Sequence, residues 1–363
     1  MQRREFLKTT AAASAACALP WLPSAARAEA QGGAWRTFEV TTRVEVLKPS
    51  GPTRVWLPTP LTAAAPYQKP GENVWKAESG DAAFSTDTKY GAGIVAAEWP
   101  AGQKPVLVLT SRVSTQDVAV DLSRAGSAPA EKAEVLKLYL EPTDLLPTDG
   151  IVRDTASQIV KDAGAKTDVE KARAIYDWVC DNTFRDPKTR GCGVGDIKTM
   201  LETKNLSGKC ADLNALFVGL ARAAGVPARD VYGIRVADSR LGYKSLGKSG
   251  DITKAQHCRA EFYAAGHGWV PVDPADVRKV VLEEGGGKPI DDPVVVAARK
   301  RLFGSWEMNW MAYNYAHDLA LPRAAKGKVG FFMYPQCETA EGRLDSLDPD
   351  NFRYQITSKE VTA

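Results

Sequence analysis

The chain has 363 residues, and its 47 Lys and Arg against 44 Asp and Glu give a formal net charge of +3. The first 28 residues hold four basic side chains and one acidic side chain, which account for this whole charge, so the remaining chain is close to neutral. A near-neutral chain gives no electrostatic reason to expect nucleic acid as a partner. With this length and 44% hydrophobic residues, we expect a globular protein of two domains.

The amino terminus indicates export. The run from Arg3 to Lys8 resembles a twin-arginine signal, although Gln2 stands where Ser or Thr is usual. An alanine-rich stretch follows, and residues 26–28 have the small-x-small pattern of a cleavage site. We therefore expect residues 1–28 to be a twin-arginine signal peptide, removed to leave a periplasmic or secreted protein. The apolar stretch is too short and too broken by proline to span a membrane, and we expect no later membrane span.

Residues 34–127 have the pattern of antiparallel sheet. Apolar residues recur at every second position at Phe38, Val40, Val44 and Val46, and loops rich in Pro and Gly separate this run from later ones. Strands at this spacing predict a small β-sandwich-like amino-terminal domain.

A second domain is predicted over residues 130–282, where helical patterns begin. Thr167 and Glu170 stand three residues apart, which is the spacing of a capping box. They predict the start of a helix that carries Trp178.

Cys210 stands at the predicted start of another helix. Apolar residues recur at three- and four-residue spacing from Leu213 to Ala224, and Gly225 follows as a stop signal. The unpaired N–H groups and the dipole at a helix start stabilise a thiolate, which is the nucleophilic form of cysteine. A buried core cysteine is the alternative interpretation, because free cysteine is among the most buried residue types.

Two strands joined by a hairpin are predicted at 256–263 and 267–273. The three residues between them, 264–266, end in glycine and fit a three-residue hairpin loop. This loop predicts a register in which His257 lies opposite Asp273. Because facing side chains on one side of a sheet have Cβ atoms about 4.5–5.5 Å apart, the Asp273 carboxylate is expected to orient the His257 imidazole.

These segments resemble the transglutaminase-like superfamily. Its pattern has Gly-x-Cys opening a helix, then Arg-Ala-x-Gly-Val/Ile-Pro-Ala-Arg, then His and Asp on adjacent strands. The chain has 208–210, 222–229, His257 and Asp273 in these places. The resemblance covers about residues 167–275 and implies an α+β fold with a papain-like core, in which the helix carrying the cysteine packs on an antiparallel sheet. It also implies a catalytic triad of Cys210, His257 and Asp273.

The resemblance further implies an exported transglutaminase-like cysteine peptidase or acyltransferase that acts on a protein or peptide substrate without a cofactor. His257 would take the thiol proton, and the thiolate of Cys210 would attack an amide carbonyl to form a thioester acyl-enzyme. Water as the second nucleophile gives hydrolysis, which we favour, whereas an amine gives a protein-glutamine transamidase. A non-catalytic module that binds peptide or cell wall on the same fold is the alternative from a different class.

The reaction also needs hydrogen-bond donors for the oxyanion of its transition state. The backbone N–H of Cys210 is the predicted first donor. For the second donor, Asn205 and Trp178 are candidates, although these residue types more often serve turns and cores.

Other titratable residues have weaker claims. His267, beside the hairpin turn, is the runner-up base. His317 lies in the aromatic run 310–318, which indicates core packing more than a substrate cleft. Asp276 is expected in a turn, because Pro274 is predicted to end the preceding strand.

Five cysteines stay after Cys17 leaves with the signal. Apart from Cys210, they are Cys180, Cys192, Cys258 and Cys337. These four could form two disulfides in three ways or could stay as free thiols. A zinc site of Cys192, Cys210, His257 and Cys258 is a further alternative. We expect no metal, because no Cys-x-x-Cys pair exists and Cys258 should point away from His257 on its strand.

Residues 283–363 are predicted to be a carboxy-terminal extension of the second domain, because no linker separates them from it. Strands predicted in 329–334 and 352–356 are expected to extend its sheet. The sequence patterns leave the natural substrate, the side-chain preference and the oligomeric state open.

Overall fold

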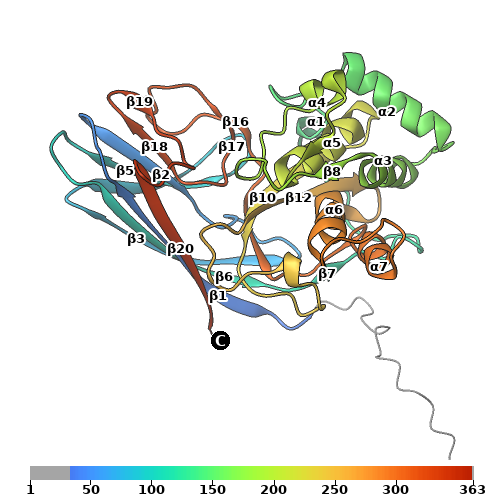
Figure 1. Cartoon of the computed structure of the whole chain (residues 1–363), viewed down its shortest axis with the longest axis horizontal. Helices are drawn as coiled ribbons and strands as arrows, with labels where there is room; N and C mark the ends of the chain where they lie inside the picture. The colour runs from blue at the N-terminus through green and yellow to red at the C-terminus, as the bar shows by residue number, and fades with distance from the viewer. Residues whose placement is uncertain (1–32, 362–363) are drawn as a thin grey trace, which may run out of the picture.

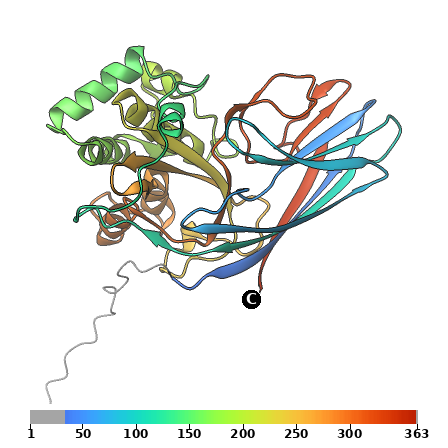
Figure 2. The same ribbon diagram turned by 180° about the vertical axis from the view of Figure 1, so that it is seen from behind.

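A computed structural model describes residues 33–361, so the predicted signal peptide, 1–28, lies outside the described residues. The molecule has two lobes side by side, one of helices around a sheet and one of long strands (Figures 1 and 2). The chain starts in the strand lobe, forms the helical lobe in its middle and returns to the strand lobe at its end (Figure 1). This combination of helices and antiparallel sheets confirms the predicted α+β class.

The helical lobe is built around α5 (Cys210–Ala223), in which residues 210–222 are all buried. A helix that is apolar and buried on all sides lies in a core rather than on a surface. The helix α3 (Asp168–Asn182) begins with the predicted capping box, because Glu170 N donates to Thr167 Oγ1 at 3.2 Å and the Glu170 carboxylate accepts from Thr167 N at 2.9 Å. The other helices are α1 (Ala133–Leu138), α2 (Gly150–Asp162), α4 (Ile197–Thr203), η1 (Lys244–Leu246), α6 (Pro274–Glu283) and α7 (Pro293–Arg301). Between residues 33 and 361, every helix is too short or too polar to cross a bilayer.

An antiparallel sheet with strand order β13-β12-β10-β15 packs against α5. Phe217 of α5 meets Phe262 of β12 with ring centroids 6.5 Å apart. The strands of this sheet are β10 (Ala228–Arg235), β12 (Gln256–Ala264), β13 (Gly268–Val272) and β15 (Trp310–Asn314). A cysteine-bearing helix on an antiparallel sheet is the core that the resemblance implied.

The β12–β13 hairpin forms, but its predicted register is wrong. Ala260 pairs with Val272, so the next position along β12, Arg259, falls opposite Asp273 instead of His257. The loop is 265–267, one residue later than predicted. A shift of two residues keeps every side chain on the same face, so polar and apolar alternation cannot detect it. His257 and Asp273 still share a face, on the diagonal of the register.

The strand lobe is a sandwich of two five-stranded sheets. Apolar side chains of both sheets share one core, with Val44 and Leu107 from the first sheet and Val55 and Val95 from the second. The first sheet has the order β11-β20-β1-β6-β3, with β1 (Arg36–Val46), β3 (Gln68–Glu78), β6 (Val106–Thr115), β11 (Gly250–Asp251) and β20 (Phe352–Val361). The second has the order β19-β18-β2-β5-β4, with β2 (Thr53–Pro58), β4 (Asp81–Thr86), β5 (Gly93–Trp99), β18 (Gln336–Thr339) and β19 (Gly342–Arg343). The β-sandwich-like part predicted from the amino-terminal pattern is therefore present.

The strand predicted in 352–356 is part of β20 and completes this sandwich, and the strand predicted in 329–334 forms β17 and pairs with β16, so the prediction that both extend the sheet under α5 is wrong. β20 pairs with β1 from Thr37↔Val361 to Val46↔Phe352, and β18 pairs with β2. Alternation identifies a strand, but it does not choose a partner hundreds of residues away. The division into 34–127, 130–282 and 283–363 stays a prediction. Short pairs join the remaining strands: β7 (Val118–Ala119) with β14 (Ser305–Trp306), β8 (Phe184–Arg185) with β9 (Ser207–Gly208), and β16 (His317–Leu319) with β17 (Val329–Phe331).

Candidate active site

Cys210 is the first residue of α5, and a glycine-rich loop fixes its backbone. Asp212 in the first turn accepts from Lys209 N at 2.9 Å and, through its other oxygen, from Val194 N and Gly195 N at 2.9 Å each. Gly193 is required there, because its φ is +95° and a Cβ would lie 1.9 Å from the Asp212 carboxylate. The turn that carries the thiol is therefore tied to the loop beside it.

The backbone N–H groups at this turn are divided between structure and the candidate oxyanion site. Ala211 N donates to Cys192 O at 2.9 Å. Within residues 33–361, Cys210 N makes no hydrogen bond, as expected for the first N–H of a helix. It is thus available to the oxyanion of an acyl group bonded to the Cys210 sulfur.

His257 and Asp273 meet at the end of β12. His257 Nε2 lies 2.7 Å from Asp273 Oδ2, and the imidazole lies close enough to the Cys210 thiol to lower its pKa. The three side chains predicted for the triad are therefore brought together. A carboxylate that holds one ring nitrogen fixes the tautomer and the orientation of the other.

Asn214 is a site residue that the sequence analysis missed. It lies one turn after Cys210 on α5, and its Nδ2 donates to Asp273 Oδ1 at 3.2 Å and to Cys258 O at 2.8 Å. Asp273 Oδ1 also caps α6 by accepting from Asp276 N at 3.0 Å. The available signal was a fully buried amide four residues after Cys210 in an otherwise apolar helix face.

A second carboxylate, Asp276, also reaches this imidazole, and its predicted place in a turn is wrong. Pro274 does end the strand, but it starts α6, whose first turn carries Asp276. Asp276 Oδ2 lies 3.4 Å from His257 Nε2, and Asp276 Oδ1 accepts from Arg235 Nη2 at 2.6 Å. The spacing of Asp273 and Asp276 is that of a helix cap and its third residue, which was a readable signal.

The electrostatics favour a thiolate and an imidazolium. Burial lowers the pKa of His257, but the charges of Asp276 and Asp273 outweigh burial and the repulsion of Arg235, and the pKa rises to about 9. The neighbouring thiols of Cys192 and Cys258, and then the imidazole of His257, hold the pKa of Cys210 well below its usual value despite burial. The proton therefore belongs on the imidazole near neutral pH.

The cysteines of the described residues are all free thiols, namely Cys180, Cys192, Cys210, Cys258 and Cys337. Of the two arrangements left open, disulfides or thiols, this structure has thiols. Cys258 Sγ donates to Cys210 Sγ at 3.8 Å, and Cys192 Sγ donates to Gln256 O at 3.3 Å.

The set of His257, Asp273 and Asp276 is the candidate metal site among the described residues, with ligand atoms within 4.8 Å of one another. It shares only His257 with the zinc alternative. Arg235 lies 2.6 Å from Asp276 and Arg259 lies 3.6 Å from Asp273, so both carboxylates already have cationic partners. The absence of a metal stays a prediction.

The remaining histidines lie elsewhere. His267 is half-buried in the β12–β13 loop, and its backbone N–H donates to Ala264 O. His317 is buried between Asp230, at 3.1 Å, and Tyr232, at 3.3 Å.

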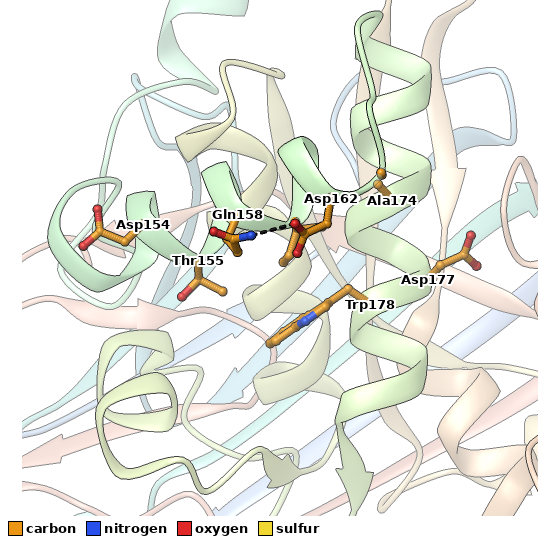
Figure 3. A pocket seen from close by; sticks show the side chains of 9 residues that line it. Asp154, Thr155, Gln158, Asp162, Ala174, Asp177 and Trp178 are labelled. Carbon is orange, nitrogen blue, oxygen red and sulfur yellow. Dashed lines mark hydrogen bonds between the residues drawn. The ribbon is translucent and has the colours of Figure 1, made fainter.

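The two candidates for the second oxyanion donor also serve structure. The Asn205 side chain accepts from the Ser207 hydroxyl at 2.6 Å, which is turn chemistry. Trp178 lies on α3 and lines a groove of about 630 Å³ between α2 and α3, with Asp154, Gln158 and Asp162 on the opposite helix (Figure 3). Neither Cys210 nor His257 lines that groove.

The thiol and the imidazole are each only 4% exposed. Cys192, Tyr334 and the partly buried Leu347 pack in the same apolar cluster as Cys210. An exposed ion pair of 2.6 Å joins Arg190, in the loop before α5, to Asp345 in the 334–347 segment. The loop before α5 and the 334–347 segment of the strand lobe thus contact each other, and we call these two segments the cover of the site.

Comparisons with known proteins show the family of the chain and its signal sequence. Residues 153–274 match the model of the transglutaminase-like superfamily, and residues 1–20 match the twin-arginine translocation signal sequence. An uncharacterized protein of Haemophilus influenzae is 36% identical over 344 residues, which cover 89% of this chain and 91% of that protein. The chain therefore belongs to the transglutaminase-like superfamily, and the predicted export by the twin-arginine pathway to the periplasm or beyond is confirmed.

One solved structure shares the fold at low identity, and a second is reported for its similarity alone. A crystal structure titled "putative cysteine protease" from Cytophaga hutchinsonii is 15% identical, covers 91% of this chain and 99% of its own, and has a TM-score of 0.50. The periplasmic domain of TgpA from Pseudomonas aeruginosa is 18% identical over 63% of this chain and 90% of its own, with a TM-score of 0.32.

Proposed function

We propose that the protein is an exported cysteine hydrolase that cleaves amide or peptide bonds through a thioester on Cys210. The observation that carries this proposal is the grouping of Cys210 at a helix start, the His257 imidazole that lowers the pKa of its thiol, and Asp273 at 2.7 Å from His257 Nε2. Nucleophile, base and orienting group in contact are the arrangement that acyl transfer requires.

The reaction starts from the thiolate of Cys210 and the imidazolium of His257. The sulfur attacks the amide carbonyl carbon, and the carbonyl oxygen becomes an oxyanion that accepts from Cys210 N–H. The C–N bond breaks as His257 gives its proton to the leaving amine, and a thioester stays on the sulfur. His257 then takes a proton from water, whose oxygen displaces the sulfur and releases a carboxylic acid.

Asp273 holds the imidazole in this cycle and does not itself gain a proton. Its Oδ2 accepts from the ring, while Asn214 and the Asp276 N–H bind its Oδ1. Burial and the charge of Asp276 raise the pKa of Asp273, and the charges of His257 and Arg259 oppose this rise. The hydrogen bonds hold the carboxylate in position, so the imidazole keeps one orientation and its second nitrogen would serve the sulfur.

Substrate reaches the sulfur when the 186–195 loop and the 334–347 segment separate. The contact that joins them at the surface is the Arg190–Asp345 pair, and exposed ion pairs contribute only about 0–1 kcal/mol. A protein or peptide substrate would take the place of Leu347 and Tyr334 above Cys210.

The proposal is tested by the products. The mature chain is incubated with a peptide mixture and an excess of a primary amine, and the products are weighed by mass spectrometry. Carboxylic acid products that are absent with Cys210→Ala support hydrolysis. Amine adducts in their place make the protein a transamidase, and unchanged peptides that stay bound make it a binding module.

A further inference from the structure

We propose that Asp276, held by Arg235, is a second positioning carboxylate that aims the His257 imidazole and stabilises its protonated form beside the Cys210 thiolate. The inference rests on the proposed function and adds a residue to its machinery.

The first observation is the way both carboxylates reach one nitrogen. Asp273 caps α6 and Asp276 is the third residue after it, so the two side chains leave the same helix start. Their Oδ2 atoms lie 2.7 Å and 3.4 Å from His257 Nε2. The ring Nε2 therefore lies between two carboxylates of one helix turn, hydrogen-bonded to Asp273 and in electrostatic contact with Asp276.

The second observation is how the oxygens of Asp276 are used. Oδ1 accepts from Arg235 Nη2 at 2.6 Å, which fixes the carboxylate against β10. Oδ2 is buried and makes no hydrogen bond of good geometry within residues 33–361, and it faces His257 Nε2. An ion pair that only tied β10 to α6 would have no need to turn a bare oxygen toward the imidazole, because buried oxygens are normally satisfied.

The charges around the imidazole favour the same role. The groups that face it are Asp273 and Asp276 from α6, Arg235 from β10, Arg259 from β12 and Cys210 from α5. The two carboxylates balance the two guanidinium groups, so a thiolate and an imidazolium can form without a net buried charge. Without the charge of Asp276, two cations would face the imidazolium across a single carboxylate.

The variant Asp276→Asn tests this role. It removes the charge and keeps the size of the side chain, so the imidazolium becomes easier to deprotonate and the thiolate harder to form. The range of pH in which the thiolate of Cys210 and the imidazolium of His257 exist together should narrow. Its alkaline limit, at which the imidazolium loses its proton, should fall by about 1 pH unit. Arg235→Gln leaves Asp276 unopposed and should raise that limit, whereas Arg235→Lys keeps the charge and should leave it close to that of the parent.

The measurement is the rate at which iodoacetamide alkylates Cys210 in the full mature chain, followed by the mass of its peptide from pH 4 to pH 10. Opening of the cover scales all rates alike, so the inflections still report the two ionisations. Glu261→Gln is the matched control, because Glu261, like Asp276, is a buried carboxylate paired with an arginine, here Arg229 at 2.7 Å. Loss of the Glu261 charge should leave both inflections in place.

The outcomes separate this inference from the proposed function. If the parent chain has no thiolate inflection below pH 7, the proposed function fails. If the parent profile is normal and Asp276→Asn leaves its alkaline inflection unmoved, the role of Asp276 is overturned while the function stands. If thermal unfolding shows that Asp276→Asn does not fold, the double variant Arg235→Gln/Asp276→Asn decides, because it leaves no unpaired charge. Asp276 acts on the pKa of His257 more strongly than Arg235 does, so the alkaline inflection of the double variant must lie below that of the parent.

Discussion

Within the described residues, two buried pairs of histidine and aspartate each take one member from the sheet under α5, namely His257 from β12 and Asp230 from β10, and only the His257 pair adjoins the candidate nucleophile. His257 contacts Asp273 at 2.7 Å, and His317 contacts Asp230 at 3.1 Å. Both imidazoles are almost fully buried. By residue types and distance alone, the two pairs are nearly equivalent.

Their surroundings separate them. The His257 pair lies beside the start of α5, which carries the thiol, and the start of α6, which carries a second carboxylate. The buried amide of Asn214 also contacts it. His317 instead lies against the ring of Tyr232, with centroids 5.6 Å apart, and Asp230 Oδ1 makes no hydrogen bond within the described residues. The comparison teaches that a buried histidine–carboxylate pair can serve packing alone. It becomes a candidate catalytic pair only where a helix start adds a nucleophile and hydrogen-bond donors for the negative charge of the transition state.

The largest expected difference comes from replacing each histidine by glutamine. His257→Gln should lower the rate of acylation at Cys210 by about 10³-fold or more, because the base is lost. His317→Gln should lower the melting temperature and leave the rate of the folded protein within a few-fold. Single-turnover formation of the thioester, read by intact mass, measures both. A loss of acylation in His317→Gln equal to that in His257→Gln would make the pairs functionally alike.

The aspartates come next. Asp273→Asn should keep the fold and lower turnover by about 10³- to 10⁴-fold, because an amide stabilises the wrong imidazole tautomer. Asp230→Asn is the matched change at the other pair and should alter stability alone. Steady-state turnover and urea unfolding of the two variants test this, and near-normal turnover of Asp273→Asn would remove Asp273 from the machinery.

Two buried asparagines extend the comparison to a smaller effect. Asn214→Ala should lower turnover by about tenfold and destabilise the fold by about 1–3 kcal/mol, because Asp273 and Cys258 O lose a donor. Asn314 stands beside the His317 pair, donating to Phe332 O at 2.7 Å and accepting from Ala316 N at 3.1 Å. Asn314→Ala should cost similar stability with little change in turnover of the folded fraction. Equal losses of turnover in both variants would show that Asn214 acts through stability only.

The smallest effect is the pH dependence of stability. The raised pKa of His257 means that its stabilisation is complete below about pH 6.5, the usual value for histidine, and is lost as the pH rises to about 9. The lowered pKa of Cys210 acts in the opposite direction over this range, so the two contributions offset each other in the parent chain. In Cys210→Ala only the histidine contributes, and its free energy of unfolding should fall by about 1–3 kcal/mol between pH 6.5 and pH 9.

Urea unfolding of Cys210→Ala at several pH values measures this fall. The double variant Cys210→Ala/His257→Gln is the control and should show a flat profile over the same range. A flat profile in the single variant would mean that folding does not raise the pKa of His257.

The elements that could be predicted from the sequence are those set by local rules. The capping box at Thr167 and Glu170, the start of α5 at Cys210 and the existence of the β12–β13 hairpin follow from spacing along the chain. The shared face of His257 and Asp273 also follows from the sequence, because side chains alternate between the two faces along each strand.

The rest depends on contacts between distant segments. A hairpin shifted by two residues keeps the same faces, so only packing chooses between Arg259 and His257 as the neighbour of Asp273. The role of Asn214 appears only when α5 crosses the start of α6, and that of Asp276 only when β10 brings Arg235 to it. The alternation of polar and apolar residues likewise does not identify the partner strands of β18 and β20.

The pairing of β20 with β1 also has a consequence for biosynthesis. β20 finishes the first sandwich sheet, although the whole helical lobe lies between β1 and β20 along the chain. This sheet contributes Phe38, Val40 and Ile356 to the apolar cluster that contains Cys210. A chain synthesised only through the helical lobe therefore lacks part of this cluster. The thiol gains its final surroundings only after β20 has paired with β1, which suits a protein that carries a signal for transport across the membrane as a finished fold.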